Sequence, residues 1–481
     1  MAMENIINIG KRRELLWDEF LIDTGKTTAK FKKHSLTPKD IVLNHDEPWE
    51  GDGCNYHSII KEDGFYRMYY LGWKTKNPNV KTKNETGIVV CYANSCNGIS
   101  WYKPKLGLCE FDGSKENNII LDHTHARFDN FFVFKDSNPY CPKTELYKGI
   151  GLDNNDRYLW CFTSENGINF HKSHRMSNKG TFDTLNVAFW DTNAGEYVCY
   201  IRDYHSKKGK VVKGTDWSGI RDIRRMTSKD FKEWSIPVRI DFGYDDDYEL
   251  YTNAIQQYYR ADHMYLGFPS RYVEKKQWTP NFDQLPGVQR RKDRMKMNPR
   301  YGLTVTDCLF MTSRDGKKWN ITEEAFMSPG IESEYNWVYG DCYPAVGMIE
   351  TQSDIPYAPN EISMFVFDYH WSGLPAKLRR YTIRIDGFSS YNSLFRPCSL
   401  VTKPFVYQGK QLSINFKTSA AGFLKIKIIG KTGFIESHDI FGDSIDRNVI
   451  FKEAVPDLLS GEPVVMEITM SDADLYSFKF T

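Results

Sequence analysis

One short phrase recurs along this 481-residue chain and constrains its fold more than any other feature. It reads Ser-x-(Asp/Asn)-(Gly/Phe)-x-x-(Trp/Phe), and its copies begin at Ser95, Ser164, Ser228 and Ser313. A degenerate fifth copy, Arg-Ile-Asp-Gly-Phe, occupies residues 384–388. Asp or Asn followed by Gly is typical of a tight turn, after which the aromatic residue would begin the next strand. The repeat therefore predicts five equivalent structural units.

Two short apolar segments with strand character precede each copy of the phrase. The segments nearer the phrase are rich in aromatic residues and lie at 66–70, 147–151, 197–200, 264–268 and 362–367. The earlier segments lie at 56–60, 131–134, 187–190, 251–255 and 343–348. Five units of several short strands predict an all-β chain that contains a five-bladed β-propeller.

An acidic residue stands near the start of the first strand in every predicted blade. In a propeller this strand lines the central axis, so acids at its start would converge in a funnel. Any one of them could instead cap a turn or bond backbone amides, which is a common use of acidic side chains. The acids are Glu50 or Asp52 in blade one, then Asp129, Asp183, Glu249 and Asp341.

The texture of the sequence changes near residues 390–400. Beyond this point apolar and polar residues alternate, as at 411–416, 423–429 and 464–469. Such alternation is typical of antiparallel strands with one buried face. We therefore expect the propeller to span residues 1–395 and a C-terminal β-sandwich to span 396–481.

One stretch, residues 273–300, fits neither pattern. It contains the basic run Gln-Arg-Arg-Lys-Asp-Arg-Met-Lys at 289–296. A run of this kind predicts a solvated loop. The alternative is a lid beside the funnel or a contact between the subunits of a homo-oligomer.

The charge balance restricts the partners of the protein. With 63 Lys and Arg against 62 Asp and Glu, it lacks the basic excess that binding nucleic acid or an anionic membrane requires. No run of 18 apolar residues indicates a membrane span, and the first ten residues do not resemble a secretory signal. We therefore expect a cytoplasmic protein. Its ten scattered cysteines form no CxxC pair and are expected to be reduced.

No sequence motif points to a cofactor. Gly-x-Ser-x-Gly, the Walker loop and the Rossmann glycine fingerprint are all absent. The His-Thr-His sequence at 123–125 is similar to a metal-binding pair, but one such pair on a loop is a weak signal, so we predict neither metal nor cofactor. Aromatic residues reach 15%, and flat aromatic faces are common in sugar-binding clefts.

Several stretches carry a resemblance to a known superfamily. They are Pro-Trp-Glu-Gly (48–51), residues 182–191, Arg-Asp-Ile-Arg (221–224), residues 249–255, Ser-Arg-Asp-Gly (313–316), Asn-Trp-Val-Tyr-Gly (336–340), and residues 418–422 and 472–476 in the tail. The chain resembles the five-bladed propeller glycoside hydrolases that include invertases, fructanases, arabinanases and xylosidases. The greatest similarity is to an uncharacterised bacterial group of family 32-like glycosyl hydrolases.

This resemblance implies roles for the acids. Glycoside cleavage needs two carboxyl groups across the scissile bond, and these enzymes add a third that stabilises the transition state. The implied nucleophile or base in blade one is Glu50 or, as an alternative, Asp52, although the Asn-Asp-Pro-Asn-Gly signature is absent there. Asp183 in blade three is the implied stabiliser, and Glu249 in blade four the implied general acid.

Further residues could bind the hydroxyl groups of a sugar. Arginine and aspartate suit bidentate contacts to such groups, and aromatic side chains suit the walls of the site. The candidates for substrate binding are Asp129, Arg202, Arg221, Asp222, Arg271, Asp307, Asp341, Trp337 and Tyr339. As alternatives, Arg221 and Asp222 could pair with neighbouring strands, and the aromatic residues could belong to the core.

The sequence thus predicts hydrolysis of a furanoside, fructofuranosyl or arabinofuranosyl, or of a related glycoside. One alternative is a propeller phosphorylase, which needs a basic cluster near the funnel such as Arg221, Arg224 and Arg225. The other is a propeller that binds glycans without cleaving them.

Overall fold

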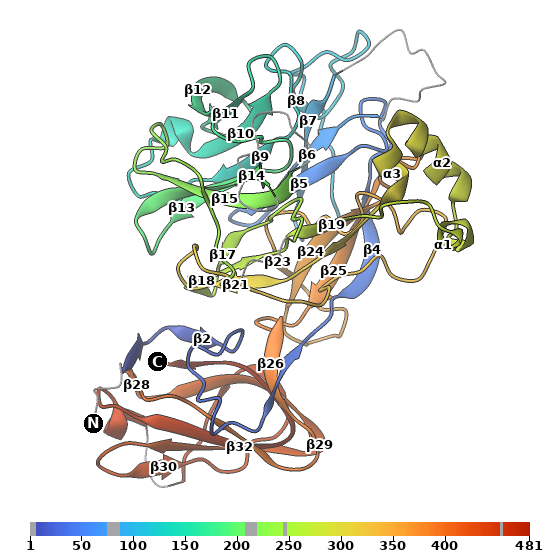
Figure 1. The fold of residues 1–481 in the computed structure, drawn as a ribbon. Helices are drawn as coiled ribbons and strands as arrows, with labels where there is room; N and C mark the ends of the chain where they lie inside the picture. Colours follow the sequence, from blue (N-terminus) through green and yellow to red (C-terminus); the bar gives the residue numbers. More distant parts are fainter. Residues whose placement is uncertain (1–5, 75–86, 207–218, 244–247, 453–455) are drawn as a thin grey trace.

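The computed structural model describes residues 6–74, 87–206, 219–243, 248–452 and 456–481. The chain forms two β-rich parts, with the larger part above the smaller one in Figure 1. Among the described residues, no helix has the length and apolar character needed to cross a membrane.

The larger part is a five-bladed β-propeller of four-stranded antiparallel sheets, which confirms the predicted fold. Blade one contains β5 (Asn55–Lys61), β6 (Tyr66–Gly72), β7 (Val89–Ser95) and β8 (Ile119–Leu121). Blade two contains β9 (Phe132–Lys135), β10 (Tyr147–Asp153), β11 (Tyr158–Ser164) and β12 (His171–Ser177). Blade three contains β13 (Val187–Asp191), β14 (Glu196–His205), β15 (Ile220–Ser228) and β16 (Val238–Arg239).

The remaining two blades complete the circle. Blade four contains β17 (Gln256–Tyr258), β18 (Ala261–Gly267), β21 (Met311–Ser313) and β22 (Asn320–Ile321). Blade five contains β23 (Ile349–Thr351), β24 (Glu361–Asp368), β25 (Lys377–Ile383) and β4 (Thr37–Asn44). Because β4 comes from the N-terminal part of the chain, its pairing with β25 closes the ring.

The repeated phrase forms the turn after the third strand in blades one to four. In the first copy, the Ser95 hydroxyl accepts a hydrogen bond from the Gly98 N–H (2.9 Å). The Asn97 side chain accepts another from the Ser100 N–H (2.8 Å). Gly98 has a φ of +72°, which glycine adopts without strain. Phe231 takes the same left-handed conformation in the third copy, with a φ of +65°.

Two predicted strands are wrong. Residues 251–255 and 343–348 are not regular strands, and the first strands of blades four and five are the shorter β17 and β23. The backbone there bonds to other partners, because the Tyr251 N–H donates to the Ser270 carbonyl (2.6 Å) and the Val346 N–H to the His57 carbonyl (2.9 Å). These bonds hold both segments against neighbouring parts of the propeller without a continuous ladder.

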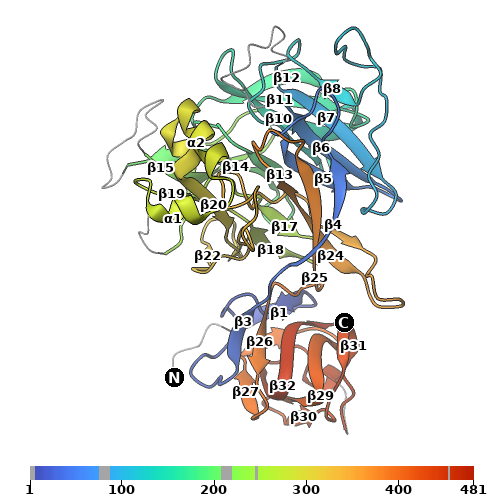
Figure 2. The ribbon, with the colours of Figure 1, turned by 90° about the vertical axis from the view of Figure 1, so that its right-hand side faces the viewer.

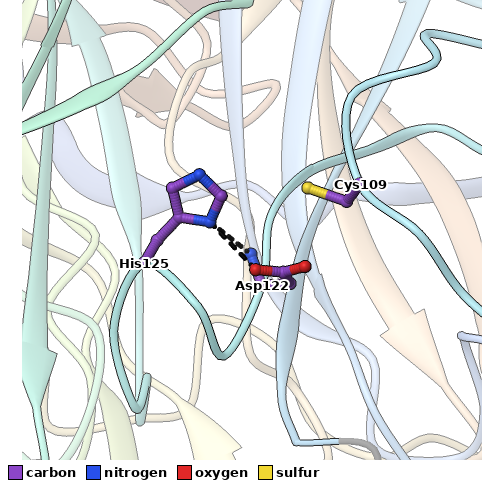
Figure 3. A group of neighbouring side chains, drawn as sticks. All are labelled: Cys109, Asp122 and His125. Atoms are coloured by element: carbon purple, nitrogen blue, oxygen red, sulfur yellow. Dashed lines mark hydrogen bonds and ion pairs between the residues drawn. The ribbon is translucent and has the colours of Figure 1, made fainter.

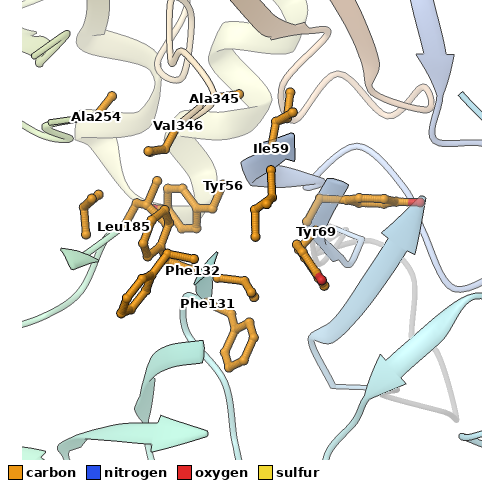
Figure 4. Packing of buried hydrophobic residues seen from close by; sticks show 14 of the residues in the cluster. Tyr56, Ile59, Tyr69, Phe131, Phe132, Leu185, Ala254, Ala345 and Val346 are labelled. Carbon is orange, nitrogen blue, oxygen red and sulfur yellow. The ribbon is translucent and has the colours of Figure 1, made fainter. Parts of the chain in front are cut away.

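Apolar side chains fill the middle of the propeller axis. Figure 4 shows this packing, with Tyr56, Ile59, Phe131, Phe132, Leu185, Ala254, Ala345 and Val346 from all five blades. All of them are buried. Because burial of apolar surface stabilises the fold, this cluster holds the blades together.

The stretch predicted as a solvated loop, residues 273–300, is largely helical from residue 280 onward. It contains α1 (Pro280–Gln284), α2 (Val288–Met297) and α3 (Pro299–Leu303), which lie on the outside of the propeller (Figures 1 and 2). The basic run has no Gly or Pro and consists mainly of residues that favour helix. Arg291 and Arg294 of α2 are buried and donate to backbone carbonyls, including those of Trp337 and Trp371.

The smaller part is the C-terminal β-sandwich, and its strands come from both ends of the chain. Its longest strands, β29 (Leu412–Ile429) and β32 (Val465–Phe480), pair along most of their length. Five further strands lie around them: β26 (Ser389–Ser393), β27 (Cys398–Val401), β28 (Phe405–Tyr407), β30 (Phe434–Glu436) and β31 (Asp443–Asn448).

The N-terminal strands belong to the same unit. β1 (Ile7–Gly10) pairs with β28, β2 (Arg13–Leu15) with β32, and β3 (Lys30–Lys33) with β26. Strand pairing therefore groups the first strands of the chain with the sandwich, although the sequence analysis had placed residues 1–395 in the propeller.

Candidate active site

A polar cluster, which we call the funnel cluster, lies where the chain enters the first strands of the blades. It consists of Asp129, Asp183, Arg202, Arg221 and Glu249, and tyrosine rings surround it. The acids precede the first strands of blades two, three and four, and both arginines lie on strands of blade three. The funnel cluster therefore brings together three acids and two arginines that were predicted separately from the sequence.

Asp183 is held by two residues of β14. The Tyr204 hydroxyl donates to Asp183 Oδ2 (3.3 Å), and Arg202 Nη2 lies 3.6 Å from Oδ1. Arg202 and Tyr204 are two residues apart on one strand, so their side chains share a face. The turn before Asp183 is fixed as well, because Phe182 has a φ of +56° and its N–H donates to the Arg202 carbonyl.

Asp129 is the second acid of the funnel cluster. Asn130 Nδ2 donates to Asp129 Oδ2 (3.3 Å). Burial, together with the nearby negative charge of Asp183, raises the pKa of Asp129 above its ordinary value. A carboxyl group with a raised pKa beside a second acid is typical of acid–base sites.

Glu249 forms a short ion pair with Arg221, with 2.5 Å between Oε2 and Nη1. The Arg221 guanidinium also lies 3.8 Å from the centre of the Tyr272 ring. Tyr272 belongs to β19 (Ser270–Glu274), whose backbone N–H at Tyr272 donates to the Glu249 carbonyl (2.7 Å). The Arg221 guanidinium thus contacts both the Glu249 carboxylate and the Tyr272 ring.

Tyrosine rings form the walls around these charges. The Arg202 guanidinium lies between the rings of Tyr204 (4.7 Å) and Tyr251 (4.6 Å). The Tyr251 ring stacks on that of Tyr343 at 5.4 Å. Burial raises the pKa of the Tyr56 and Tyr343 hydroxyls, so both remain protonated and can donate hydrogen bonds.

Several buried polar atoms of this region have no hydrogen-bond partner among the described residues. They are Asp183 Oδ1, Arg202 Nε, Arg221 Nε and the Tyr343 hydroxyl. An unsatisfied buried polar group costs about 1–3 kcal/mol. A ligand rich in hydroxyl groups would remove this cost by bonding to these atoms.

The blade-one acids do not join the funnel cluster. Glu50 is fully buried within blade one, where Lys103 (2.6 Å) and the Tyr70 hydroxyl (2.5 Å) bind its carboxylate. Burial raises the pKa of Glu50, and the charge of Lys103 opposes this rise. Asp52 accepts a hydrogen bond from the Gly373 N–H (3.0 Å) of blade five. It lines a separate cavity of about 680 Å³.

Asp222 also lies apart from the funnel cluster. It follows Arg221 on β15, so its side chain points to the opposite face of the strand. There it contacts His205 (3.1 Å) and Arg224 (3.1 Å).

Arg271 of β19 and Asp307 of β20 (Thr304–Cys308) form a bidentate pair between the two strands. Arg271 Nε donates to Asp307 Oδ1 (2.9 Å) and Nη2 to Oδ2 (2.5 Å). They line a cavity of about 840 Å³ together with Phe282 and Trp337. Arg271 precedes Tyr272 on β19, so this cavity and the funnel cluster lie on opposite faces of the strand.

The last two candidates lie in blade five. Asp341 accepts a hydrogen bond from the Val338 N–H (2.8 Å), and burial raises its pKa to about 7. It lines a third cavity of about 240 Å³. Tyr339 packs edge-on against Tyr251 and Tyr272, so it supports the tyrosine wall.

Only one histidine of the His-Thr-His sequence at 123–125 lies near other potential metal ligands among the described residues. His123 is exposed, whereas His125 lies with Asp122 and Cys109 in a compact group (Figure 3). Burial and the charge of Asp122 raise the pKa of the Cys109 thiol to about 12. Cys109 was not predicted to belong to this group, because a separate loop brings it to the histidine.

Four tyrosines of the funnel were not predicted from the sequence: Tyr56, Tyr204, Tyr272 and Tyr343. For Tyr204 a signal was present, since it lies two residues after Arg202, a predicted sugar-binding residue. Tyr56, Tyr272 and Tyr343 come from three different segments of the chain, and no local pattern connects them.

No protein-family model and no curated protein sequence matches this chain. Similar solved structures include the catalytic domain of a GH62 alpha-L-arabinofuranosidase from Coprinopsis cinerea, at 11% identity and a TM-score of 0.42 over 73% of this chain and 97% of that one. A GH32 beta-fructofuranosidase from Bombyx mori has 10% identity and a TM-score of 0.39, and the match covers 93% of this chain and 94% of that one. An N-acetylgalactosamine deacetylase from F. plautii has 10% identity and a TM-score of 0.43, and the match covers 76% of this chain and 96% of that one.

Proposed function

We propose that this protein is a glycoside hydrolase and that the funnel cluster is its active site. The observation that carries the proposal is the set of unsatisfied buried atoms on Asp183, Arg202, Arg221 and Tyr343, beside three carboxyl groups. Carboxyl groups supply the acid and the nucleophile or base for glycoside cleavage, and the polar atoms match the hydroxyl groups of a sugar. The chemistry needs no cofactor.

The environments of the acids favour different roles. Asp129, with its raised pKa, is suited to protonating the leaving group. Glu249, which is ion-paired with Arg221, is suited to act as nucleophile or base. Asp183 beside Arg202 would bind the ring and stabilise positive charge. This scheme differs from the roles implied by the resemblance, in which Glu249 is the acid and blade one supplies the nucleophile.

The substrate class that we propose is a furanoside with a fructofuranosyl or arabinofuranosyl group. The resemblance of the sequence to furanosidase propellers supports this choice. The stacked rings of Tyr251 and Tyr343 supply an apolar wall, and Arg202 lies against it. Such a wall suits the CH groups of a sugar ring, while arginine and carboxylate bind its hydroxyl groups.

The arginines expected to serve a phosphorylase are already paired with acids. Arg221 binds Glu249, Arg224 binds Asp203 and Asp222, and Arg225 binds Glu196. Each guanidinium is thus neutralised by a carboxylate of this chain. We therefore favour water over phosphate as the acceptor.

The proposal is tested by release of sugar from aryl furanosides and from fructosyl, arabinosyl and xylosyl oligosaccharides, with and without phosphate. We expect turnover by the wild type without phosphate and a fall in kcat of about 10²–10⁴ in Asp129→Asn, Asp183→Asn and Glu249→Gln. Asp191→Asn is the matched control, since this buried acid of blade three binds a turn and Tyr265 at the other end of β13.

Three results would contradict the proposal. Binding of sugar without turnover by the wild type would leave a glycan-binding propeller, and turnover that requires phosphate would indicate a phosphorylase. A folded Glu50→Gln variant that loses as much kcat as Asp183→Asn, with Asp129→Asn unaffected, would return the nucleophile to blade one.

A further inference from the structure

A compact group of side chains lies at the outer edge of blade one, apart from the funnel cluster. Figure 3 shows its members, Cys109, Asp122 and His125. Cys109 belongs to the segment between β7 and β8, and the other two follow β8. Each offers one potential ligand atom, and these atoms all lie within 4.8 Å of one another. Cys109 and Asp122 are buried while His125 is partly exposed, so an ion can enter from the solvent side.

The backbone holds these residues in place before any ion binds. Asn117 Nδ2 donates to the Cys109 carbonyl (2.9 Å), and the His125 N–H donates to the Asp122 carbonyl (3.0 Å). Thr124 donates to Asp122 Oδ1 through its N–H (2.9 Å) and its hydroxyl (2.6 Å). These bonds orient the carboxylate, as second-shell partners do in metal sites.

We propose that Cys109, Asp122 and His125 bind a zinc ion. Thiolate, imidazole and carboxylate are the donors that zinc prefers, whereas magnesium and calcium take oxygen ligands only. Bond lengths of about 2.0–2.3 Å in a tetrahedron place ligand atoms roughly 3–4 Å apart. His125 Nδ1 and Asp122 Oδ1 are now 2.9 Å apart, so small side-chain rotations would open this set around the ion. A water molecule would take the fourth position.

Binding of the ion has a defined proton balance. The Cys109 thiol releases its proton to solvent and binds as thiolate. The imidazole of His125 binds as the neutral ring, with its proton on the nitrogen that does not face the ion. The zinc–ligand bonds replace the present hydrogen bond between His125 and Asp122.

The ion would join the loop between β7 and β8 to the segment that leads to the active site. The Cys109 segment packs against Trp49 through Phe111, whose rings are 5.9 Å apart. The chain beyond His125 continues to Asp129 of the funnel cluster. Zinc would thus tie the outer loop of blade one to the connection that positions Asp129. The site itself does not depend on the proposed glycosidase activity.

Cobalt serves as the spectroscopic probe for this site. We expect reduced wild-type protein to bind one Co²⁺ with a thiolate-to-cobalt charge-transfer band, and one equivalent of Zn²⁺ to abolish that band. Cys109→Ser should lack the band, and His125→Ala should bind zinc at least tenfold more weakly in calorimetric titration. His123→Ala is the matched control and should bind like the wild type, because this exposed histidine lies outside the group.

Absence of the band in folded, reduced wild-type protein would overturn the proposal without any variant. Persistence of the band in Cys109→Ser would show that another thiol binds cobalt and would also overturn it. An equal loss of affinity in His123→Ala and His125→Ala would contradict the assignment of the ligands.

Discussion

At the scale of single residues, the buried carboxyl group of Asp341 should make the free energy of unfolding depend on pH. Its folded-state pKa of about 7 lies above the ordinary value of 3.8, so its contribution to stability is complete below pH 3.8 and is lost as the pH rises towards 7. Asp341→Asn keeps an acceptor for the Val338 N–H but cannot ionise. We expect the wild type to lose about 2–3 kcal/mol relative to Asp341→Asn between pH 5 and pH 8. Urea unfolding of both proteins at the two pH values measures this difference.

Asp46→Asn is the control for this experiment, since its carboxylate is largely exposed and should leave the pH dependence unchanged. Parallel unfolding profiles of the wild type and Asp341→Asn across this range would show that Asp341 ionises normally in the folded protein.

At the scale of elements, the repeated turns connect neighbouring blades. Gly167 of the blade-two turn has a φ of +72°, and its carbonyl accepts a hydrogen bond from Tyr69 of blade one (2.7 Å). A Cβ atom here would lie 2.8 Å from the Tyr69 hydroxyl. Gly167→Ala should therefore lower the free energy of unfolding through backbone strain of about 1–2 kcal/mol and through displacement of Tyr69. Urea or thermal unfolding measures the total.

Gly113→Ala isolates the strain, because Gly113 has a φ of +79° and no atom within 4 Å of the added Cβ. We expect Gly167→Ala to be the more destabilising of the two. Equal losses would mean that the contact between the blades contributes nothing.

At the scale of the whole molecule, the acid of the fifth repeat joins propeller and sandwich. Asp386 is fully buried and accepts hydrogen bonds from Tyr258 (2.6 Å) of blade four and Ser477 (2.7 Å) of β32. It also pairs with Arg260 (3.2 Å) and Arg13 (3.4 Å). Asp386→Ala should cost about 3–5 kcal/mol because it leaves two arginines without this buried partner. In calorimetry we expect one unfolding transition of the wild type to separate into two.

Asp443→Ala provides the comparison, since its ion pair with Arg384 is exposed and should contribute less than about 1 kcal/mol. A single transition in Asp386→Ala, at the wild-type temperature, would show that the two parts are coupled by other contacts.

The five blades and the C-terminal β unit were predictable from local sequence patterns. Each repeat encodes its own turn through contacts between neighbours, such as Ser95 with Gly98, and each strand shows its character locally. The positions of Asp183 and Glu249 before blades three and four were also predictable in this way. The helices at 280–303 were missed because their charge, rather than their helix propensity, guided the prediction.

Which side chains contact one another in the site depends on how the blades pack and could not be predicted from local patterns. Glu50 is buried against Lys103, so Tyr56 is the blade-one residue that lies near the funnel cluster. Asp129 and Asp183 lie close together there. The tertiary structure also places the N-terminal strands in the sandwich. The physical reason is that turns and strands depend on residues a few positions apart, whereas a funnel at the centre of a ring depends on how all five blades pack.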